Sequence, residues 1–186
     1  LVPGGFGSRG IEGMIAAADY CRETGLPYFG ICLGMQISVI AFARSVAGME
    51  DANSGEFDPE SSHKVIDFLP DQSESVAKGG TLRLGAYPCH IRPGTKMMEA
   101  YAVPHIYERH RHRYEFSNTF REPLEQAGLV ISGTSPDGYI VETVELPDHP
   151  FYVGVQFHPE FKSRPNKPHP LFVSFVKACL GGCDSL

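Results

Sequence analysis

The amino-acid sequence predicts an α/β protein with a central, mostly parallel sheet between layers of helices. Short apolar stretches alternate with segments of helical periodicity in the first 47 residues, a pattern typical of βαβ units. Glycine-rich turns separate these stretches. The length of 186 residues and the hydrophobic content of 42% allow one domain with a sizeable core.

The first part of the chain predicts a helix, a strand and a second helix. Residues 11–24 carry apolar side chains at helical spacing, and Gly25 ends this segment. Residues 28–31 predict a short buried strand. Residues 33–47 predict a largely apolar helix, with Gly48 just beyond its end.

The rest of the chain predicts a long loop followed by further strands and helices. Residues 49–78 are polar and predict a functional loop with one apolar patch at 65–69. Residues 81–91 and 106–116 predict strands of a more antiparallel region. The other expected elements are helices at 95–101, 118–126 and 171–180 and strands at 129–132, 139–145 and 151–157.

Charge and cysteine content exclude several classes of protein. A net charge of −6 argues against a general nucleic-acid-binding protein, which carries a basic surplus. No apolar run approaches the roughly 20 residues that span a bilayer, and the first residues do not resemble a signal peptide. Five cysteines do not form a disulfide framework, so we expect a cytoplasmic protein. Cys179 and Cys183 lack a second pair and are interpreted as structural thiols.

The start of the chain predicts a piece of a longer protein. Leu1-Val2-Pro3 has the character of a strand end that runs into a turn, with nothing before it to pair with. We therefore expect a single domain over residues 1–186, with at least a strand and a helix missing before Leu1.

Cys32 is the candidate nucleophile. It lies where the strand of residues 28–31 meets the next helix, and Gly30 and Gly34 flank it in a G-x-C-x-G pattern. This is the thiol counterpart of the G-x-S-x-G elbow, whose strained turn requires small neighbours. A helix N-terminus favours thiolate over thiol, so we expect an ionised sulfur. The alternative is a buried, inert cysteine.

His158 and Glu160 are the candidate base and its orienting partner. The strand at 151–157 ends in His158-Pro159-Glu160, and the two-residue spacing lets the carboxylate hold the imidazole by a hydrogen bond. With Cys32, these residues follow the nucleophile, base and orienter order of a catalytic triad. Taken alone, the tripeptide also fits a surface turn.

Backbone N–H groups are the expected donors to an oxyanion. The N–H of Leu33 follows the nucleophile, and the turn at Gly4-Gly5 can bring a second N–H close because glycine has no side chain. The turn could instead hold a phosphate, although it matches neither a P-loop nor a dinucleotide-binding motif.

Residues 109–113 alternate between arginine and histidine. If they form a strand, the arginines share one face and His110 and His112 the other. Clustered guanidinium groups suit a carboxylate or phosphate ligand, but a solvated charged edge or a His-x-His metal pair would give the same pattern. Glu56 could meet the amino group of an amino-acid substrate.

Three motifs together resemble the class I glutamine amidotransferase family. They are Pro3-Gly4-Gly5-Phe6-Gly7, Gly30-Ile31-Cys32-Leu33-Gly34-Met35-Gln36 and Phe157-His158-Pro159-Glu160-Phe161. Further stretches at 51–57, 79–85 and 108–115 are similar to the CTP synthase family within that class. The resemblance implies a flavodoxin-like, three-layer fold with a small antiparallel extension.

The resemblance also implies roles for individual residues. Cys32 would attack the side-chain carboxamide of glutamine, and His158, oriented by Glu160, would protonate the departing ammonia and then activate water. Gly5 and Leu33 would form the oxyanion hole. The implied glutamine-binding residues are Gly5, Leu33, Gly34, Met35, Gln36, Glu56, Arg113 and Tyr114. No metal site is implied.

The same resemblance implies a partner domain. The ammonia would pass to a synthetase domain, absent from this chain, that uses ATP and Mg²⁺ to aminate UTP to CTP, with GTP as allosteric activator. The fragment itself would need no cofactor and show glutaminase activity only, and the full-length enzyme would be a homotetramer that binds neither nucleic acid nor membrane. The alternatives are another class I amidotransferase, a non-catalytic regulatory domain of this fold, or an RNA-binding module built on residues 109–113.

Overall fold

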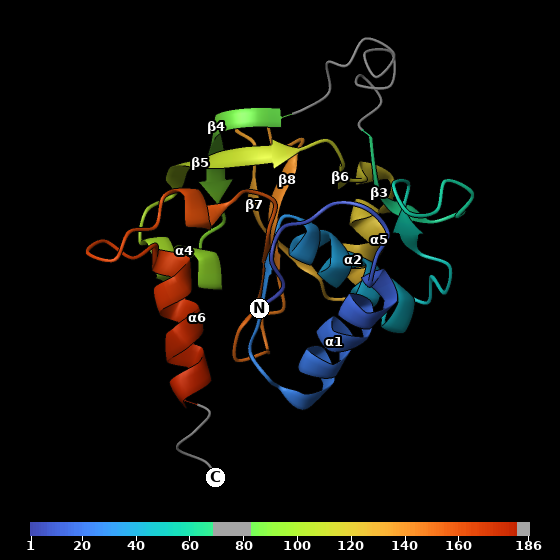
Figure 1. Cartoon of the computed structure of the whole chain (residues 1–186), viewed down its shortest axis with the longest axis horizontal. Coiled ribbons are helices and arrows are strands. Elements are labelled where there is room, and N and C mark those ends of the chain that lie inside the picture. The colour runs from blue at the N-terminus through green and yellow to red at the C-terminus, as the bar shows by residue number, and fades with distance from the viewer. Residues whose placement is uncertain (69–82, 182–186) are drawn as a thin grey trace.

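The computed structural model describes residues 1–68 and 83–181 and shows a six-stranded sheet with helices on both faces. Figure 1 shows α1 and α2 on one side of this sheet and α6 on the other. In spatial order, the strands are β1 (Tyr28–Ile31), β9 (Tyr152–Val155), β8 (Val141–Glu145), β7 (Val130–Thr134), β4 (Arg83–Ile91) and β5 (His105–His112). The helices are α1 (Ile11–Thr24), α2 (Leu33–Ser45), α4 (Lys96–Tyr101), α5 (Arg121–Gln126) and α6 (Pro170–Gly181), with 3-10 turns η2 (Asn118–Phe120) and η3 (Pro159–Phe161).

The main sheet is mixed, whereas the sequence predicted a mostly parallel one. Among the described strands, β1 and β9 pair in parallel, and the pairs from β9 through β8, β7 and β4 to β5 are antiparallel. The reason lies in the connections. Loops without a helix join β7 to β8 and β8 to β9, and such short links return the chain antiparallel to its neighbour.

Two apolar cores, one on each face of the sheet, produce the three layers. Successive side chains of a strand point to opposite faces, so Tyr28 packs into the core beneath α1 and α2 and Phe29 into the core beneath α6. Tyr28 stacks on Tyr152 with ring centroids 4.6 Å apart, and Phe29 meets Phe172 edge-on at 5.7 Å. The two cores hold β1 and β9 side by side.

Residues 106–116, predicted as one strand, divide between two sheets. β5 ends at His112, and β6 (Glu115–Phe116) pairs with β3 (Lys64–Asp67) in a second sheet that also contains β2 (Asn53–Ser54). The predicted long loop therefore contains two short strands. Its later part, the beginning of the strand expected from residue 81, and Cys183 lie outside the described residues.

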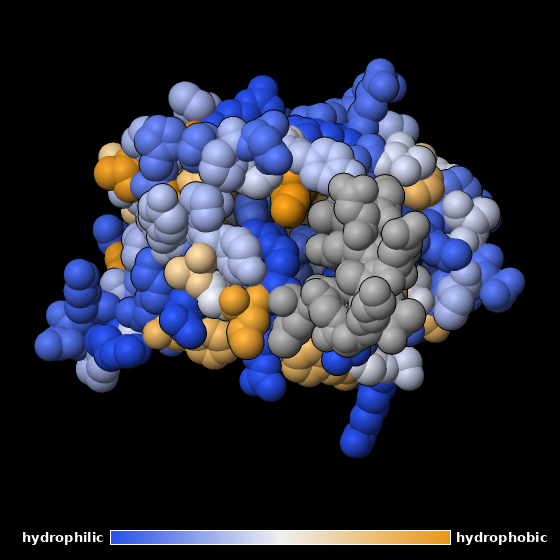
Figure 2. All heavy atoms as spheres, turned by 90° about the horizontal axis from the view of Figure 1, so that it is seen from above, coloured by the Kyte–Doolittle hydropathy of each residue, from blue (hydrophilic) through white to orange (hydrophobic). Residues whose placement is uncertain are grey.

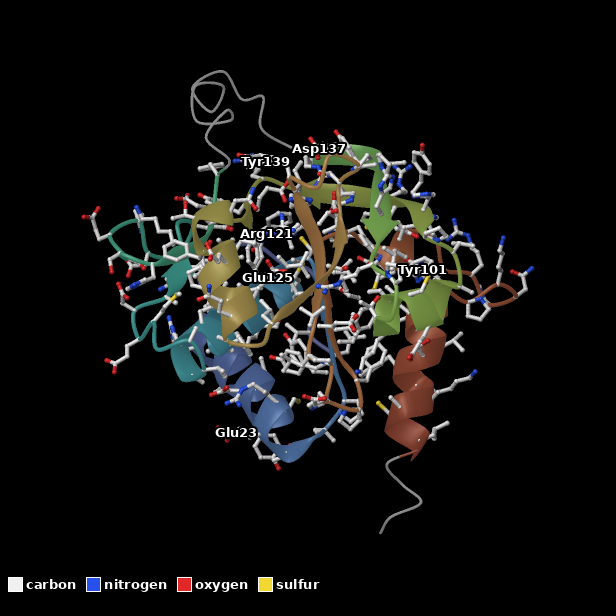
Figure 3. All side chains as sticks on the ribbon, turned by 180° about the vertical axis from the view of Figure 1, so that it is seen from behind. Glu23, Tyr101, Arg121, Glu125, Asp137 and Tyr139 are labelled. Atoms are coloured by element: carbon white, nitrogen blue, oxygen red, sulfur yellow. The ribbon has the colours of Figure 1, made fainter. Side chains whose placement is uncertain are left out.

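Most of the other predicted elements are confirmed with small shifts of their ends. The helix at 11–24 and the strand at 28–31 match α1 and β1. The helix predicted at 118–126 is the η2 turn followed by α5. In Figure 3, Arg121 of α5 lies below the loop that carries Asp137 and Tyr139, and its guanidinium donates to the Gly138 carbonyl at 2.8 Å. No helix in the described part of the chain has the length and apolar character needed to cross a bilayer.

Candidate active site

Cys32 lies on a strained turn between β1 and α2. Its φ of 52° and ψ of −102° are rare for a residue with a side chain, and the surrounding contacts hold it there. Its backbone N–H donates to the Val155 carbonyl of β9 at 2.7 Å. A Cβ atom on Gly30 would stand 2.5 Å from the carbonyl carbon of Gly34, so the turn packs only because Gly30 has none.

Burial opposes ionisation of the Cys32 thiol, whereas the sequence predicted an ionised sulfur. Burial raises the pKa of this thiol to about 12. A hydrogen bond with the Leu33 backbone and one with the Gln156 side chain lower the pKa, but the charges of Glu160 and Glu115 raise it further. Burial outweighs the position at the helix N-terminus, and attack by this sulfur therefore requires a base.

His158 follows β9 and is held by Glu160. Imidazole Nδ1 lies 2.6 Å from Oε1 of Glu160, and the ring stacks on Phe161 at a centroid distance of 4.7 Å. The His158 backbone N–H donates to the Arg109 carbonyl, which ties the turn to β5. Nε2 is buried and has no hydrogen-bond partner within residues 1–68 and 83–181. This nitrogen is therefore the one free to exchange a proton.

The parallel pairing of β1 and β9 brings the elbow and the His-Pro-Glu turn to one edge of the sheet. Ile31 is in register with Val155, so Cys32 and His158 both lie just beyond the carboxyl ends of adjacent strands. Gly4 lies between them, because a Cβ on it would clash with the His158 imidazole and contact the Cβ of Cys32. A Cβ on Gly5 would likewise stand 3.0 Å from Leu33 Cδ2, so Gly5 lies beside the Leu33 side chain.

A cavity of about 480 Å³ opens beside the Cys32 side chain. Its lining residues are Gly5, Phe6, Cys32, Gln36, Glu56, Arg111, His112, Arg113 and Tyr114. Six of these were predicted as site residues from the sequence. The Met35 side chain is instead packed under Gly154 of β9, and Leu33 and Gly34 are buried in the first turn of α2.

Opposite charges line this cavity. The Glu56 carboxylate accepts a hydrogen bond from the Gly7 N–H at 3.2 Å, which joins the loop after β2 to the glycine-rich turn. Arg111 and Arg113 also line this cavity. An acidic group and two guanidinium groups beside a thiol suit a free α-amino acid, which carries one ammonium and one carboxylate.

The alternation of residues 109–113 places arginine and histidine on opposite faces. Arg109 and Arg111 of β5 are exposed, and His110 and His112 are buried. Figure 2 views the molecule from above, the side on which β4 and β5 lie. The described part of this surface is mostly hydrophilic. Imidazole Nδ1 of His110 lies 2.8 Å from Nε2 of His112. No group of three or more metal-ligating side chains occurs among the described residues, so the His-x-His pair has no third ligand there.

A buried ionic cluster lies behind His112. The Arg83 guanidinium donates to Glu142 at 2.7 Å and to Glu115 at 3.3 Å, and all three side chains are almost fully buried. Burial raises the pKa of Glu115 to about 8, against the opposing charge of Arg83. One cation therefore faces two carboxyl groups, a balance that favours a proton on one of them near neutral pH.

Four residues around Cys32 were not among the site residues predicted from the sequence, although the arginines and histidines of residues 109–113 were considered as ligands. Phe6, Arg111 and His112 line the cavity, and Gln156 contacts the Cys32 sulfur. One signal was present for Gln156, because it is a polar residue inside the otherwise apolar run of residues 151–157. The pairing of its side chain is a tertiary contact that no local pattern predicts.

Comparison with known proteins agrees with this geometry. Residues 1–178 match the family model for glutamine amidotransferase class-I. The chain belongs to that family. It is 63% identical to a CTP synthase of Moorella thermoacetica and 64% identical to one of Carboxydothermus hydrogenoformans, over 96% and 97% of its own length. It spans about a third of the length of these two relatives, 33% and 34%.

Solved structures show the same amidotransferase fold. The glutaminase domain of Trypanosoma brucei CTPS with bound acivicin superposes with a TM-score of 0.92 at 42% identity, over 97% of this chain and 70% of that one. A glutamine amidotransferase from Thermotoga maritima superposes with a TM-score of 0.54 at 15% identity, over 85% of this chain and 54% of that one, which shows a common fold alone.

Proposed function

We propose that the chain hydrolyses L-glutamine to glutamate and ammonia, as the glutaminase part of a CTP synthase. The main support for this proposal is the position of the buried Cys32 thiol on a strained turn. His158 lies at the same edge of the sheet, and its Nε2 has no hydrogen-bond partner among the described residues. The adjacent cavity holds both acidic and basic side chains. Similarity to CTP synthases and to a CTPS glutaminase domain supports glutamine as the substrate.

In the proposed reaction, His158 first acts as a base and then as an acid. Nε2 takes the thiol proton while the Cys32 sulfur attacks the carboxamide carbon of glutamine. The N–H groups of Gly5 and Leu33 stabilise the oxyanion. His158 then gives its proton to the amide nitrogen, the C–N bond breaks, and ammonia leaves a glutamyl thioester.

Water completes the cycle. His158 takes a proton from water as the oxygen attacks the thioester carbonyl, the C–S bond breaks, and the proton returns to the sulfur. Glu160 holds Nδ1 throughout and stabilises the imidazolium that forms twice. Gln36, Glu56, Arg113 and Tyr114 hold the amino and carboxylate groups of glutamine, with Gly34 and Met35 contributing backbone only.

The ammonia would serve a synthetase domain of the same polypeptide. The relatives are about three times as long as this chain, which supports a further domain that uses ATP and Mg²⁺ to aminate UTP to CTP under activation by GTP. We further propose that the full-length enzyme is a cytoplasmic homotetramer.

Labelling and turnover test this proposal on the purified protein that contains the chain. We expect 6-diazo-5-oxo-L-norleucine, a diazo-ketone analogue of glutamine, to alkylate Cys32. Peptide mass spectrometry detects the modified residue. Cys32→Ser abolishes both the label and glutamate release, whereas Cys179→Ser, at an exposed position on α6, retains both. Glutamate release by Cys32→Ser refutes the mechanism. Absence of release and label in the parent protein favours the non-catalytic regulatory domain.

A second assay identifies the acceptor of the ammonia. The whole protein is supplied with UTP, ATP and Mg²⁺ and either glutamine or ammonium chloride. We expect Cys32→Ser to lose CTP formation from glutamine and to keep it from ammonium chloride. Glutamine hydrolysis without CTP from either nitrogen source indicates another class I amidotransferase.

A further inference from the structure

Gln156 occupies a position that the proposed triad does not explain. It follows β9, its side chain is fully buried, and its Nε2 lies 3.6 Å from the Cys32 sulfur, within hydrogen-bond range for a sulfur acceptor. A buried primary amide carries two N–H donors and one carbonyl, and each is costly to leave without a partner.

The orientation of this amide follows from an acceptor on a neighbouring segment. The Tyr114 backbone carbonyl can only accept hydrogen bonds, and it lies 3.2 Å from Nε2 of Gln36. Gln36 must therefore turn its NH₂ group toward Tyr114. The same Nε2 lies 3.2 Å from Oε1 of Gln156, so the Gln156 carbonyl faces Gln36.

The NH₂ group of Gln156 consequently faces Cys32. Reversing the Gln156 amide would set two NH₂ groups against each other, and reversing both amides would set the Gln36 carbonyl against the Tyr114 carbonyl. The sulfur is the acceptor that the described residues offer to this NH₂ group. A chain of three hydrogen bonds thus runs from the Tyr114 carbonyl through Gln36 and Gln156 to the nucleophile.

We propose that Gln156 is a catalytic residue whose side-chain amide donates a hydrogen bond to the Cys32 sulfur and stabilises it as an anion. This inference rests on the proposed function, because it assigns the bond to the sulfur that attacks glutamine. A thiol is a weak acceptor and a thiolate a strong one, so the bond strengthens as the proton leaves for His158. Stabilisation that grows along the reaction coordinate accelerates the chemical step.

The surroundings of the sulfur make such a donor valuable. Burial and the carboxylates of Glu160 and Glu115 raise the pKa of the Cys32 thiol, whereas the amide of Gln156 lowers it. The titratable or charged groups that face the sulfur or line its cavity are His158, Glu160, Glu115, Glu56, Arg111, His112, Arg113 and Tyr114. The amide of Gln156 adds a hydrogen-bond donor that does not titrate near neutral pH.

Alkylation of Cys32 by iodoacetamide, followed from pH 6 to pH 10 by mass spectrometry without glutamine, tests the proposal. We expect Gln156→Met, which keeps the volume and removes the donor, to alkylate about tenfold more slowly at pH 7.5 and to shift the profile upward by about one pH unit. Gln156→Glu places a carboxyl group against the sulfur and is slower still. Profiles equal to that of the parent protein overturn the proposal.

Thr143→Val is the matched control. Thr143 is buried in β8, and its hydroxyl bonds Ser132 at 2.8 Å, so the variant loses one buried hydrogen bond in the same sheet. It lowers the unfolding midpoint and leaves the alkylation profile unchanged. If Gln156→Met does not fold, Gln156→Glu, which replaces one NH₂ group by oxygen, decides the question in the same assay.

Steady-state kinetics distinguish stabilisation of the Cys32 thiolate by Gln156 from a role in which Gln156 only positions the Gln36 side chain. We expect Gln156→Met to lower kcat for glutamine about tenfold with KM changed less than about threefold. A raised KM at unchanged kcat would mean that Gln156 only holds Gln36 in place, and would overturn the proposal. Alkylation needs no glutamine, so its outcome stands even if glutamine is not the substrate.

Discussion

The imidazole of His158 lies directly against Gly4: a Cβ atom on this glycine would stand 2.7 Å from Cε1 of His158 and 3.6 Å from the Cβ of Cys32. The glycine-rich turn therefore packs between the proposed nucleophile and the proposed base. Glu160 holds the imidazole from its Nδ1 side, so the ring has little room to retreat. The absence of a side chain at Gly4 is what allows the two groups to share one edge of the sheet.

Gly4→Ala is expected to damage catalysis more than stability. The added methyl group must push the imidazole away, and a displacement of about 1 Å costs on the order of 100-fold in rate. Glutamate release and the thermal midpoint measure the two effects. Gly13→Ala is the control, because Gly13 lies exposed on α1 with no atom within 4 Å of an added Cβ, and this change stabilises the helix by about 0.5–1 kcal/mol. Full activity of Gly4→Ala would contradict this packing.

Glu160→Gln is expected to lower kcat for glutamine by about 10- to 100-fold with little change in KM. The amide no longer balances the imidazolium that forms during both half-reactions. Because the Glu160 charge raises the pKa of the Cys32 thiol, we expect Cys32 to be alkylated at least as fast as in the parent protein. Glu99→Gln, an exposed change on α4, leaves both quantities unaltered. A parallel loss of turnover and alkylation would indicate a disordered site instead.

Glu115→Gln is expected to change how stability depends on pH. Burial raises the pKa of Glu115 to about 8 in the folded protein, above its ordinary value of 4.5. The folded state therefore binds more protons than the unfolded state between these values, and the free energy of unfolding falls as pH rises through this range. The variant loses this contribution, so its free energy of unfolding rises relative to that of the parent by about 3 kcal/mol between pH 5 and pH 8.

Urea unfolding at pH 5, 6.5 and 8 measures this difference. Glu122→Gln, at an exposed position on α5, is the control and retains the pH slope of the parent protein. An unchanged slope in Glu115→Gln would place the excess proton of the ionic cluster on Glu142 instead, whose pKa burial also raises.

Local features of the fold were predictable because each is encoded in a few consecutive residues. The strand at 28–31, the elbow at Cys32 and the start of α2 follow from nine adjacent residues, since apolar periodicity and two glycines suffice to define them. The His-Pro-Glu turn is equally local. The long loop of residues 49–78 was not resolved into β2 and β3, because strands of two and four residues carry almost no periodicity.

Local sequence patterns were sufficient to identify Cys32 as the candidate nucleophile, His158 as its candidate base, and charged side chains as candidate ligands for an amino acid. Tertiary structure decided three other features: the mixed pairing of the sheet, the buried state of the thiol, and the contact of Gln156 with a sulfur 124 residues away. These depend on which strands become neighbours and in what register. Register is set by packing between distant segments, so a local pattern does not contain it.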